Sequence, residues 1–175
     1  KNGVVNNRSK PDLRDPSTTI ATVLNQSGYR TGFIGKAHMG GDPRVWGFKE
    51  TPLWLPTGGS RHQNPMLMVN GKEQVVTGQI TQIFTDAAIG WIDKHKADRW
   101  CLWLAMTAPH TPYVHDPKHP YEREKIQPPP MWPKGEPLSA KYDWPGYYST
   151  ISMLDEQIGR LLAKLKEIGQ LDKTL

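Results

Sequence analysis

Apolar side chains recur at helical spacing in two long segments of the chain. The first segment spans residues 77–95 and the second residues 147–168, and in each one the apolar positions fall on a single stripe. Such stripes predict amphipathic α-helices that cover one face of a core. The stripe of the first comprises Ile80, Ile83, Phe84, Ala87, Ala88, Trp91 and Ile92, and that of the second Ile151, Leu154, Ile158, Leu161, Leu162, Leu165 and Ile168.

A shorter helix is predicted near the start of the chain. Residues 1–16 are polar and indicate a loop, and an apolar face begins at Ile20. Ser17 or Thr18 can cap the free amide groups of this helix. Gly28 stands where a left-handed residue commonly ends a helix, so we expect the helix to stop there.

Two short apolar runs predict strands. Residues 29–34 form the first and are broken by Gly35, and residues 100–107 form the second. The second run is almost entirely apolar, which is typical of a strand covered on both faces. Residues 66–76 carry Asn70-Gly71 between two apolar runs, which predicts an exposed β-hairpin because both residues accept positive φ.

The remaining segments show no sustained period. Residues 41–65 are predicted to be irregular, and residues 109–145 carry proline repeatedly and predict a long surface loop. The order helix, strand, helix, strand, helix indicates an α/β fold with a mostly parallel sheet flanked by helices. Two core strands and a hairpin are too few for a covered parallel sheet, so we expect part of a domain.

Composition narrows the function classes. The chain has 175 residues, a net charge of +5 and a single cysteine, Cys101, which excludes an internal disulfide and a cysteine-based zinc site. No apolar run approaches the length of a membrane span, and no basic helix face indicates nucleic-acid binding. No signal peptide is recognisable, but the first residue is Lys1 rather than Met, which makes this observation weak.

Candidate chemistry follows the ends of the two predicted strands. Lys36 and His38 lie two residues apart just after the first strand, and His110 follows the second. In an open α/β sheet, ligands bind outside the carboxyl ends of the strands, so a cation and imidazoles there predict an anion site. Taken singly, a Lys-x-His pair is more often surface decoration, and a histidine between prolines is more often an ordinary loop residue.

Several segments, taken in order, resemble motifs of the sulfatases, which belong to the alkaline phosphatase superfamily. Leu24-Asn-Gln-Ser-Gly-Tyr-Arg-Thr-Gly-Phe-Ile-Gly-Lys-Ala-His-Met-Gly resembles their second signature. Val69-Asn-Gly-Lys resembles their short hairpin, and Thr85-Asp-Ala-Ala-Ile the following helix. Leu104-Ala-Met-Thr-Ala-Pro-His-Thr-Pro-Tyr resembles their strand-to-histidine motif, and Met153-Leu-Asp-Glu-Gln-Ile-Gly-Arg-Leu-Leu their late helix.

The resemblance implies a role for three residues. Lys36 matches the lysine that binds the sulfate oxygens, and a reference pKa of about 10.4 keeps such a lysine cationic. His38 matches the histidine that contacts a hydrated formylglycine nucleophile, which is a general acid/base role. His110 matches the histidine near the bridging ester oxygen, so Lys36 and His110 are also the expected substrate-binding residues.

Other family features are missing from the sequence. Cys101 lies in an apolar run and lacks the Cys/Ser-x-Pro-x-Arg pattern of the nucleophile, and in Ser9-Lys-Pro-Asp-Leu-Arg14 the arginine comes one place late. The family's Asp-Asp pair and its late Asp-Asn-Gly, which bind a divalent cation, are absent. Lys1-Asn-Gly-Val-Val-Asn-Asn resembles the segment after the nucleophile, and Ala37 replaces the usual Trp between Lys and His.

These departures predict that residues 1–175 are an internal fragment of a sulfatase catalytic domain, inactive by itself. The complete protein is then expected to hold calcium and formylglycine through residues outside this chain, with no metal ligand inside it. A small-molecule or carbohydrate sulfate ester is the expected partner. Sulfatases lead us to expect a periplasmic, secreted or lysosomal location.

Two alternatives to a sulfatase remain open. A phosphodiesterase or phosphonate monoester hydrolase of the same superfamily would share these motifs, and a non-catalytic binding protein could retain the fold. Among the other histidines, His62 has no support for a role and His95 is expected at a helix end. His115 and His119 lie in the proline-rich loop and are weak candidates for a substrate cleft, and Asp155 is expected to be solvated or a capping group.

Overall fold

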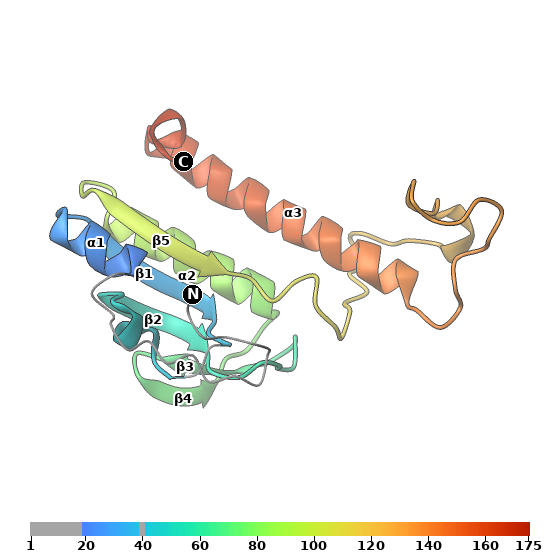
Figure 1. Cartoon of the computed structure of the whole chain (residues 1–175), viewed down its shortest axis with the longest axis horizontal. Coiled ribbons are helices and arrows are strands. Elements are labelled where there is room, and N and C mark those ends of the chain that lie inside the picture. Colours follow the sequence, from blue (N-terminus) through green and yellow to red (C-terminus); the bar gives the residue numbers. More distant parts are fainter. Residues whose placement is uncertain (1–18, 39–40) are drawn as a thin grey trace.

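The chain forms one open five-stranded sheet with helices on both faces (Figure 1). The computed structural model describes residues 19–38 and 41–175. The helices are α1 (Ile20–Gln26), α2 (Ile80–Lys94) and α3 (Trp144–Glu167), and the short 3-10 turns are η2 (Pro43–Trp46), η3 (Arg123–Lys125) and η4 (Leu171–Lys173). The strands are β1 (Arg30–Lys36), β2 (Glu50–Leu55), β3 (Met66–Val69), β4 (Lys72–Val75) and β5 (Trp100–Ala105).

The sheet is parallel in its centre and antiparallel at one side. Its strand order is β4-β3-β2-β1-β5, with β1 parallel to both β2 and β5. β3 runs antiparallel to β2 and to β4. The predicted α/β class with a mostly parallel sheet is therefore confirmed.

Strand β2 was not predicted, because residues 41–65 were expected to be irregular. That prediction is wrong: the segment contains η2 and then β2, which pairs with β1. Pro52 interrupts the pattern, and the only apolar run is three residues long. Leu53, Trp54 and Leu55 are all buried, with Trp54 in a different core cluster from the two leucines, so no alternation of apolar and polar residues marks the strand.

The hairpin forms where it was predicted, but it is not a separate exposed unit. Asn70 and Gly71 have φ of 49° and 82°, as the turn requires. β4 is exposed along its length, whereas β3 extends the sheet through β2 and buries Leu67 completely. The described residues therefore form three parallel strands and a hairpin that pairs with them, rather than two core strands and a separate hairpin.

Strand β5 was expected to be covered on both faces, and this expectation is wrong for the residues that the structure describes. β5 is the edge strand beside β1, and Trp103 leaves 52% of its surface exposed. Although β5 is almost entirely apolar, its side chains are not fully buried by the residues that the structure describes.

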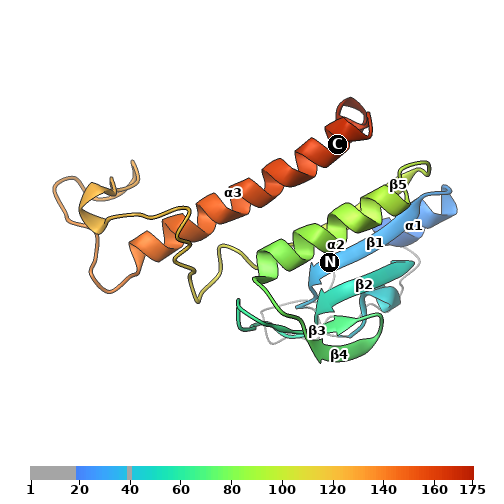
Figure 2. The ribbon, with the colours of Figure 1, turned by 180° about the vertical axis from the view of Figure 1, so that it is seen from behind.

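Two apolar cores lie on opposite faces of the sheet. Ile34 of β1 packs toward α2 with Phe84 and Trp91, whereas Phe33 packs toward α1 and η2. Successive side chains of a strand point to opposite faces, so β1 contributes side chains to both cores. Figure 2, seen from behind, shows α2 lying across its face of the sheet.

Helix α1 begins at Ile20 and is capped by Thr19, whereas Ser17 or Thr18 was expected as the cap. The side chain of Thr19 accepts a hydrogen bond from the amide of Thr22, at 3.2 Å, and caps the helix. Ser17 and Thr18 lie outside the described residues. Gly28 has φ of 80°, and the amide of Tyr29 donates to the carbonyl of Leu24, so the predicted glycine stop is confirmed.

Helix α3 joins two parts of the molecule. Its second half packs against α2 through Leu161, Leu165 and Ile168. Its first half extends beyond the sheet together with the proline-rich loop (Figures 1 and 2). Apart from η3, residues 109–143 of this loop form no helix or strand, as predicted. Within the described part of the chain, no helix is long and apolar enough to cross a membrane.

Candidate active site at the carboxyl edge of the sheet

The carboxyl ends of the three parallel strands meet at one edge of the sheet. Lys36 pairs in register with Leu55 of β2, and Gly35 pairs with Ala105 of β5. The amide of Ala37 donates to the carbonyl of Leu55 at 2.9 Å, which continues this pairing one residue past β1. The segments after these strands therefore start side by side, as expected for a ligand site in an α/β sheet.

Gly35 allows β1 and β5 to approach each other closely just before the edge. Its φ is 119°, and a Cβ atom there would collide with the carbonyl group of Ala105. Only glycine avoids both the conformational strain and the collision. This close approach helps to fix Lys36 relative to the segment that leads to His110.

The predicted residues Lys36 and His38 both lie at this edge. Lys36 is half-buried and has no ion pair with any of the residues that the structure describes. A cation without a counter-ion favours an anionic ligand. His38 is exposed, and its ring lies against Gly58, where a side chain would collide with Nε2.

His110 lies in the segment that follows β5. Its amide donates to the carbonyl of Thr107 at 2.9 Å, which forms a turn just past the strand. Its Nδ1 lies 2.6 Å from the carbonyl oxygen of Thr111, and since a carbonyl only accepts, Nδ1 carries the proton. The exposed ring therefore keeps Nε2 for exchange of a proton with a ligand.

His62 is a fourth basic residue of this site, and sequence reasoning missed it. Its side chain is only 8% exposed. Burial lowers the pKa of His62, and the nearby charges of His110 and Lys36 lower it further. The signal that could have found it is its place after β2, which was itself not predicted.

An apolar cavity of about 300 Å³ adjoins Lys36 and His38 on the α1 face of the sheet. Its walls include the aromatic rings of Phe33, Trp46, Phe48 and Trp103. The charged end of the cavity is thus at the strand edge, and its other walls suit an apolar group. This arrangement fits a ligand with both an anionic and an apolar part.

Two other groups named from the sequence do not join the site. Cys101 is half-buried in β5, and burial raises the pKa of its thiol, which disfavours the reactive thiolate. His95 ends α2, as predicted, and its two ring nitrogens lie 2.9 Å from Glu50 and 3.0 Å from Asp98. These carboxylates tie the end of α2 to the start of β2, away from the edge that carries Lys36.

The remaining weak candidates, His115 and His119, contact α3 or its capping residue. His115 lies 2.8 Å from Asp143, the capping residue of α3, and His119 lies 3.1 Å from Glu156. Asp155 is exposed, in agreement with the solvated position expected for it.

The described residues do not fit a calcium ion at the edge of the sheet. Calcium prefers six to eight oxygen ligands, whereas Lys36, His38, His62 and His110 offer nitrogen donors only. In residues 19–38 and 41–175, only Asp116, His119 and Glu156 gather three groups that could hold a metal ion. Residues 1–7 and 9–14, which were compared with the nucleophile region, lie outside the described residues.

Comparisons with known proteins agree on one family. The sulfatase family model matches residues 1–175. The chain is 30% identical over 124 residues to an N-acetylglucosamine-6-O-sulfatase of Bacteroides thetaiotaomicron, which is 68% of this chain and 21% of that protein. It is 28% identical over 135 residues to the uncharacterized sulfatase YdeN of Escherichia coli strain K12, which is 76% of this chain and 22% of that protein.

Solved structures show the same fold. The structure of BT4656 in complex with its substrate D-glucosamine-2-N,6-O-disulfate superposes with a TM-score of 0.76 at 22% identity, over 98% of this chain and 50% of that one. The structure of Ps i-CgsB in complex with k-i-k-neocarrahexaose gives 0.68 at 24% identity, over 97% and 39%. The chain thus spans about a fifth of the curated relatives and half or less of these solved chains. Because the family model covers every residue of the sequence, and the fold agrees with it, the chain belongs to the sulfatase family.

Proposed function

We propose that this chain supplies the anion-binding and proton-transfer residues of a sulfuric ester hydrolase that acts on a sulfated sugar. The observation that carries the proposal is the gathering of basic groups at one edge of the sheet. Lys36 ends β1, and His62 and His110 follow β2 and β5; burial lowers the pKa of His62, and repulsion from His110 and Lys36 lowers it further. An anion bound among them would relieve that repulsion.

Each residue has a role in this proposal. Lys36, as a compact cation, binds the sulfate oxygens and stabilises charge that builds there in the transition state. His110 holds a proton at Nε2 and donates it to the departing alcohol oxygen, while its Nδ1 bond to Thr111 orients the ring. His38, at the rim of the site, exchanges a proton with the nucleophile.

Two groups of the complete enzyme are assigned to sequence outside these residues. A formylglycine would supply the oxygen nucleophile that attacks sulfur, and a divalent cation, calcium in our expectation, would neutralise sulfate charge. The oxygen ligands for that cation would come from other residues, because Lys36, His38, His62 and His110 offer nitrogen donors only. The 175 residues alone are then inactive, and measurable sulfatase turnover by this chain would contradict that part of the proposal.

The sugar in the proposal is supported by the similar proteins. The solved structure with the highest TM-score quoted above holds a disulfated glucosamine as its substrate, and one curated relative is an N-acetylglucosamine-6-O-sulfatase. A sulfated sugar combines an anion with a ring whose carbon–hydrogen face packs on aromatic side chains. The aromatic walls beside Lys36 offer such a surface.

The test is replacement of Lys36 by Ala in the complete protein. Removing one stabilising group from a developing charge costs roughly 10²–10³-fold in rate, so we expect a fall of that size in kcat/KM with glucosamine 6-sulfate. Lys49→Ala is the matched control, because Lys49 is an exposed lysine just before β2, at the opposite edge of the sheet. Unchanged kcat/KM in Lys36→Ala would remove Lys36 from the site.

Paired substrates separate the alternatives. Faster turnover of an aryl phosphonate than of an aryl sulfate would favour the phosphonate or phosphodiester hydrolase. Binding of sulfated sugar without turnover of any ester by the complete protein would favour the non-catalytic binding protein. Lys36→Ala weakens binding in all three cases, so the substrate comparison decides the class and the variant decides the site.

A further inference from the structure

The proline-rich loop is fastened along the first half of α3 by side chains of that helix. The amide of Val114 donates to Oγ1 of Thr150 at 2.8 Å, and the amide of Asp116 donates to Oγ of Ser149 at 2.8 Å. Further along, the hydroxyls of Tyr121 and Ser152 lie 2.7 Å apart. Residues 114–121 therefore run beside the helix in a defined position.

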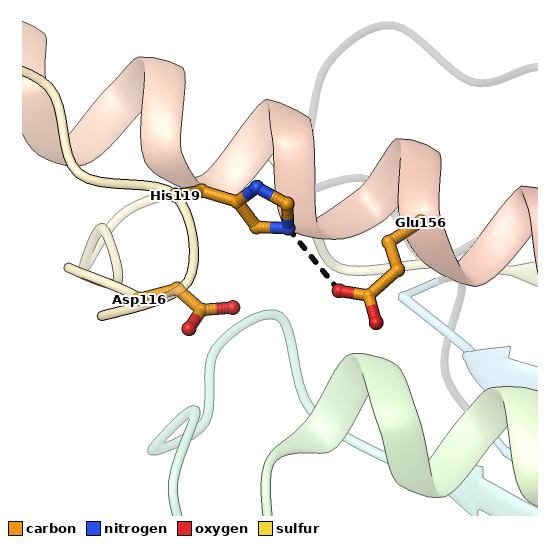
Figure 3. A group of neighbouring side chains, drawn as sticks. All are labelled: Asp116, His119 and Glu156. Carbon is orange, nitrogen blue, oxygen red and sulfur yellow. Dashed lines mark hydrogen bonds and ion pairs between the residues drawn. The ribbon is translucent and has the colours of Figure 1, made fainter.

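Three side chains converge where this loop passes α3. The ligand atoms of Asp116, His119 and Glu156 all lie within 4.8 Å of one another. Figure 3 shows Asp116 and His119 on the loop, facing Glu156 on the helix. The amide of His119 donates to the carbonyl of Asp116 at 2.9 Å, so a tight turn holds the two loop residues near each other.

The turn is also fixed by the Asp116 side chain. Its Oδ1 accepts a hydrogen bond from the amide of Lys118 at 3.0 Å, which leaves Oδ2 for another partner. Together with the bond from its own amide to Ser149, this holds Asp116 within reach of His119 and Glu156. Side chains held by such supporting bonds are what a metal site requires.

We propose that Asp116, His119 and Glu156 bind a divalent transition-metal ion of the zinc type. Imidazole nitrogen and carboxylate oxygen are both ligand types that Zn²⁺ accepts, whereas calcium and magnesium prefer oxygen alone. Bonds of about 2.1 Å at tetrahedral angles separate ligand atoms by roughly 3.4 Å, and His119 and Glu156 are already 3.1 Å apart. Only Asp116 has to move closer, and a water completes four-coordination.

Binding replaces two existing contacts. Glu156 now accepts from Nε2 of His119, and its other oxygen lies 3.5 Å from Nζ of Lys118. The carboxylate of Glu156 thus faces both a hydrogen-bond donor and a cation. Lys118 is 66% exposed and can turn to solvent, while the metal takes the place of the proton on His119.

The proposed ion would add a further link between the loop and the helix, beside the contacts that Val114, Asp116 and Tyr121 already make with α3. A cation that bridges two loop residues and one helix residue would stiffen the loop against the helix. This effect does not depend on the reaction of the enzyme, and it is measurable without any substrate.

The test is titration of the 175-residue chain with Zn²⁺ alone, followed by calorimetry at neutral pH. We expect one ion per chain, and a loss of affinity of at least about tenfold in either His119→Ala or Glu156→Gln, since each removes one of three ligands. His115→Ala is the matched control, because His115 forms a similar pair with Asp143 on the same loop, at 2.8 Å, but lacks a third ligand. The control variant should bind as tightly as the original chain.

A second measurement tests the proposal without any variant, in case the substitutions disturb the fold. In the unchanged chain, Zn²⁺ should slow hydrogen exchange at the amides of residues 114–121 while leaving β1 unaffected. Absence of binding, or binding that survives both His119→Ala and Glu156→Gln, would overturn the proposal. So would a site lost in His115→Ala, since the ion would then be held elsewhere on the loop.

Discussion

The edge of the sheet and the projection formed by α3 and the proline-rich loop are held together by different forces. At the edge, β1 lies between two parallel neighbours, and large apolar side chains such as Phe84 and Leu67 are fully buried behind it. In the projection, the buried side chains at the start of α3 are small or polar, as at Ser149 and Thr150, and aromatic rings of the loop and helix contact one another, as in the pairs Tyr113–Tyr147 and Trp132–Trp144. Apolar burial therefore stabilises the first region, whereas side-chain hydrogen bonds and aromatic contacts hold the second.

This difference suits the two regions to different tasks. Hydrogen bonds between the strands fix the backbone at the edge. The sheet itself therefore positions Lys36 and the start of the segment that leads to His110. The projection is held by separate side-chain contacts. It also carries exposed groups such as Met131, which leaves 92% of its surface in solvent. Regions with few buried apolar contacts open at lower free energy, so we expect the projection to move without unfolding the sheet.

Among the variants considered, Gly35→Ala is expected to destabilise the edge of the sheet most. The new Cβ would collide with the carbonyl of Ala105 at a φ of 119°, so the strands must separate or the backbone must change. We expect a loss of roughly 3–5 kcal/mol in the free energy of unfolding, measured by urea denaturation. Gly59→Ala is the control, because no atom lies within 4 Å of its added Cβ, and it should leave stability nearly unchanged.

A smaller effect, confined to the projection, is expected for Thr150→Val. The variant keeps the shape of this fully buried residue but leaves the amide of Val114 without its 2.8 Å acceptor. An unsatisfied buried group costs about 1–3 kcal/mol. Hydrogen exchange should therefore quicken at Val114, and equal quickening in β1 would show that the two regions open as one unit.

The smallest effect concerns the pH dependence of stability at the edge. Because the pKa of His62 is lowered in the folded protein, the unfolded chain binds more protons between that lowered value and about pH 6.5. The free energy of unfolding should fall as the pH decreases through this window, by at most about 1.4 kcal/mol per pH unit. Urea denaturation of the unchanged chain at several pH values measures this slope.

Two variants sharpen the result for His62. His62→Gln should remove the slope, and Lys36→Ala should reduce it, since the charge of Lys36 contributes to the shift. His115→Gln, on the projection, serves as a control for an exposed histidine. A slope that is unchanged in His62→Gln would mean that another group causes it.

The sequence alone determined the features that depend on neighbours along the chain. The helix α2 with its buried stripe, the helix α3, the glycine stop at Gly28 and the turn at Asn70-Gly71 were all predicted, because spacing and turn chemistry are local properties. In α3, however, Ile158 and Leu162 of the predicted stripe are exposed. The motif order also identified the family, and it named Lys36, His38 and His110 as candidate site residues. These inferences needed no knowledge of which segments meet.

Only the tertiary structure decided the features that depend on segments far apart in the sequence. β2 is a strand because β1 offers it hydrogen bonds and burial on both faces, which its short apolar run with Pro52 does not reveal. His62 lies near Lys36 because the segment after β2 starts at the same edge of the sheet. His119 contacts Glu156 only because the loop packs along α3. Pairing across the chain, rather than residue pattern, placed these groups together.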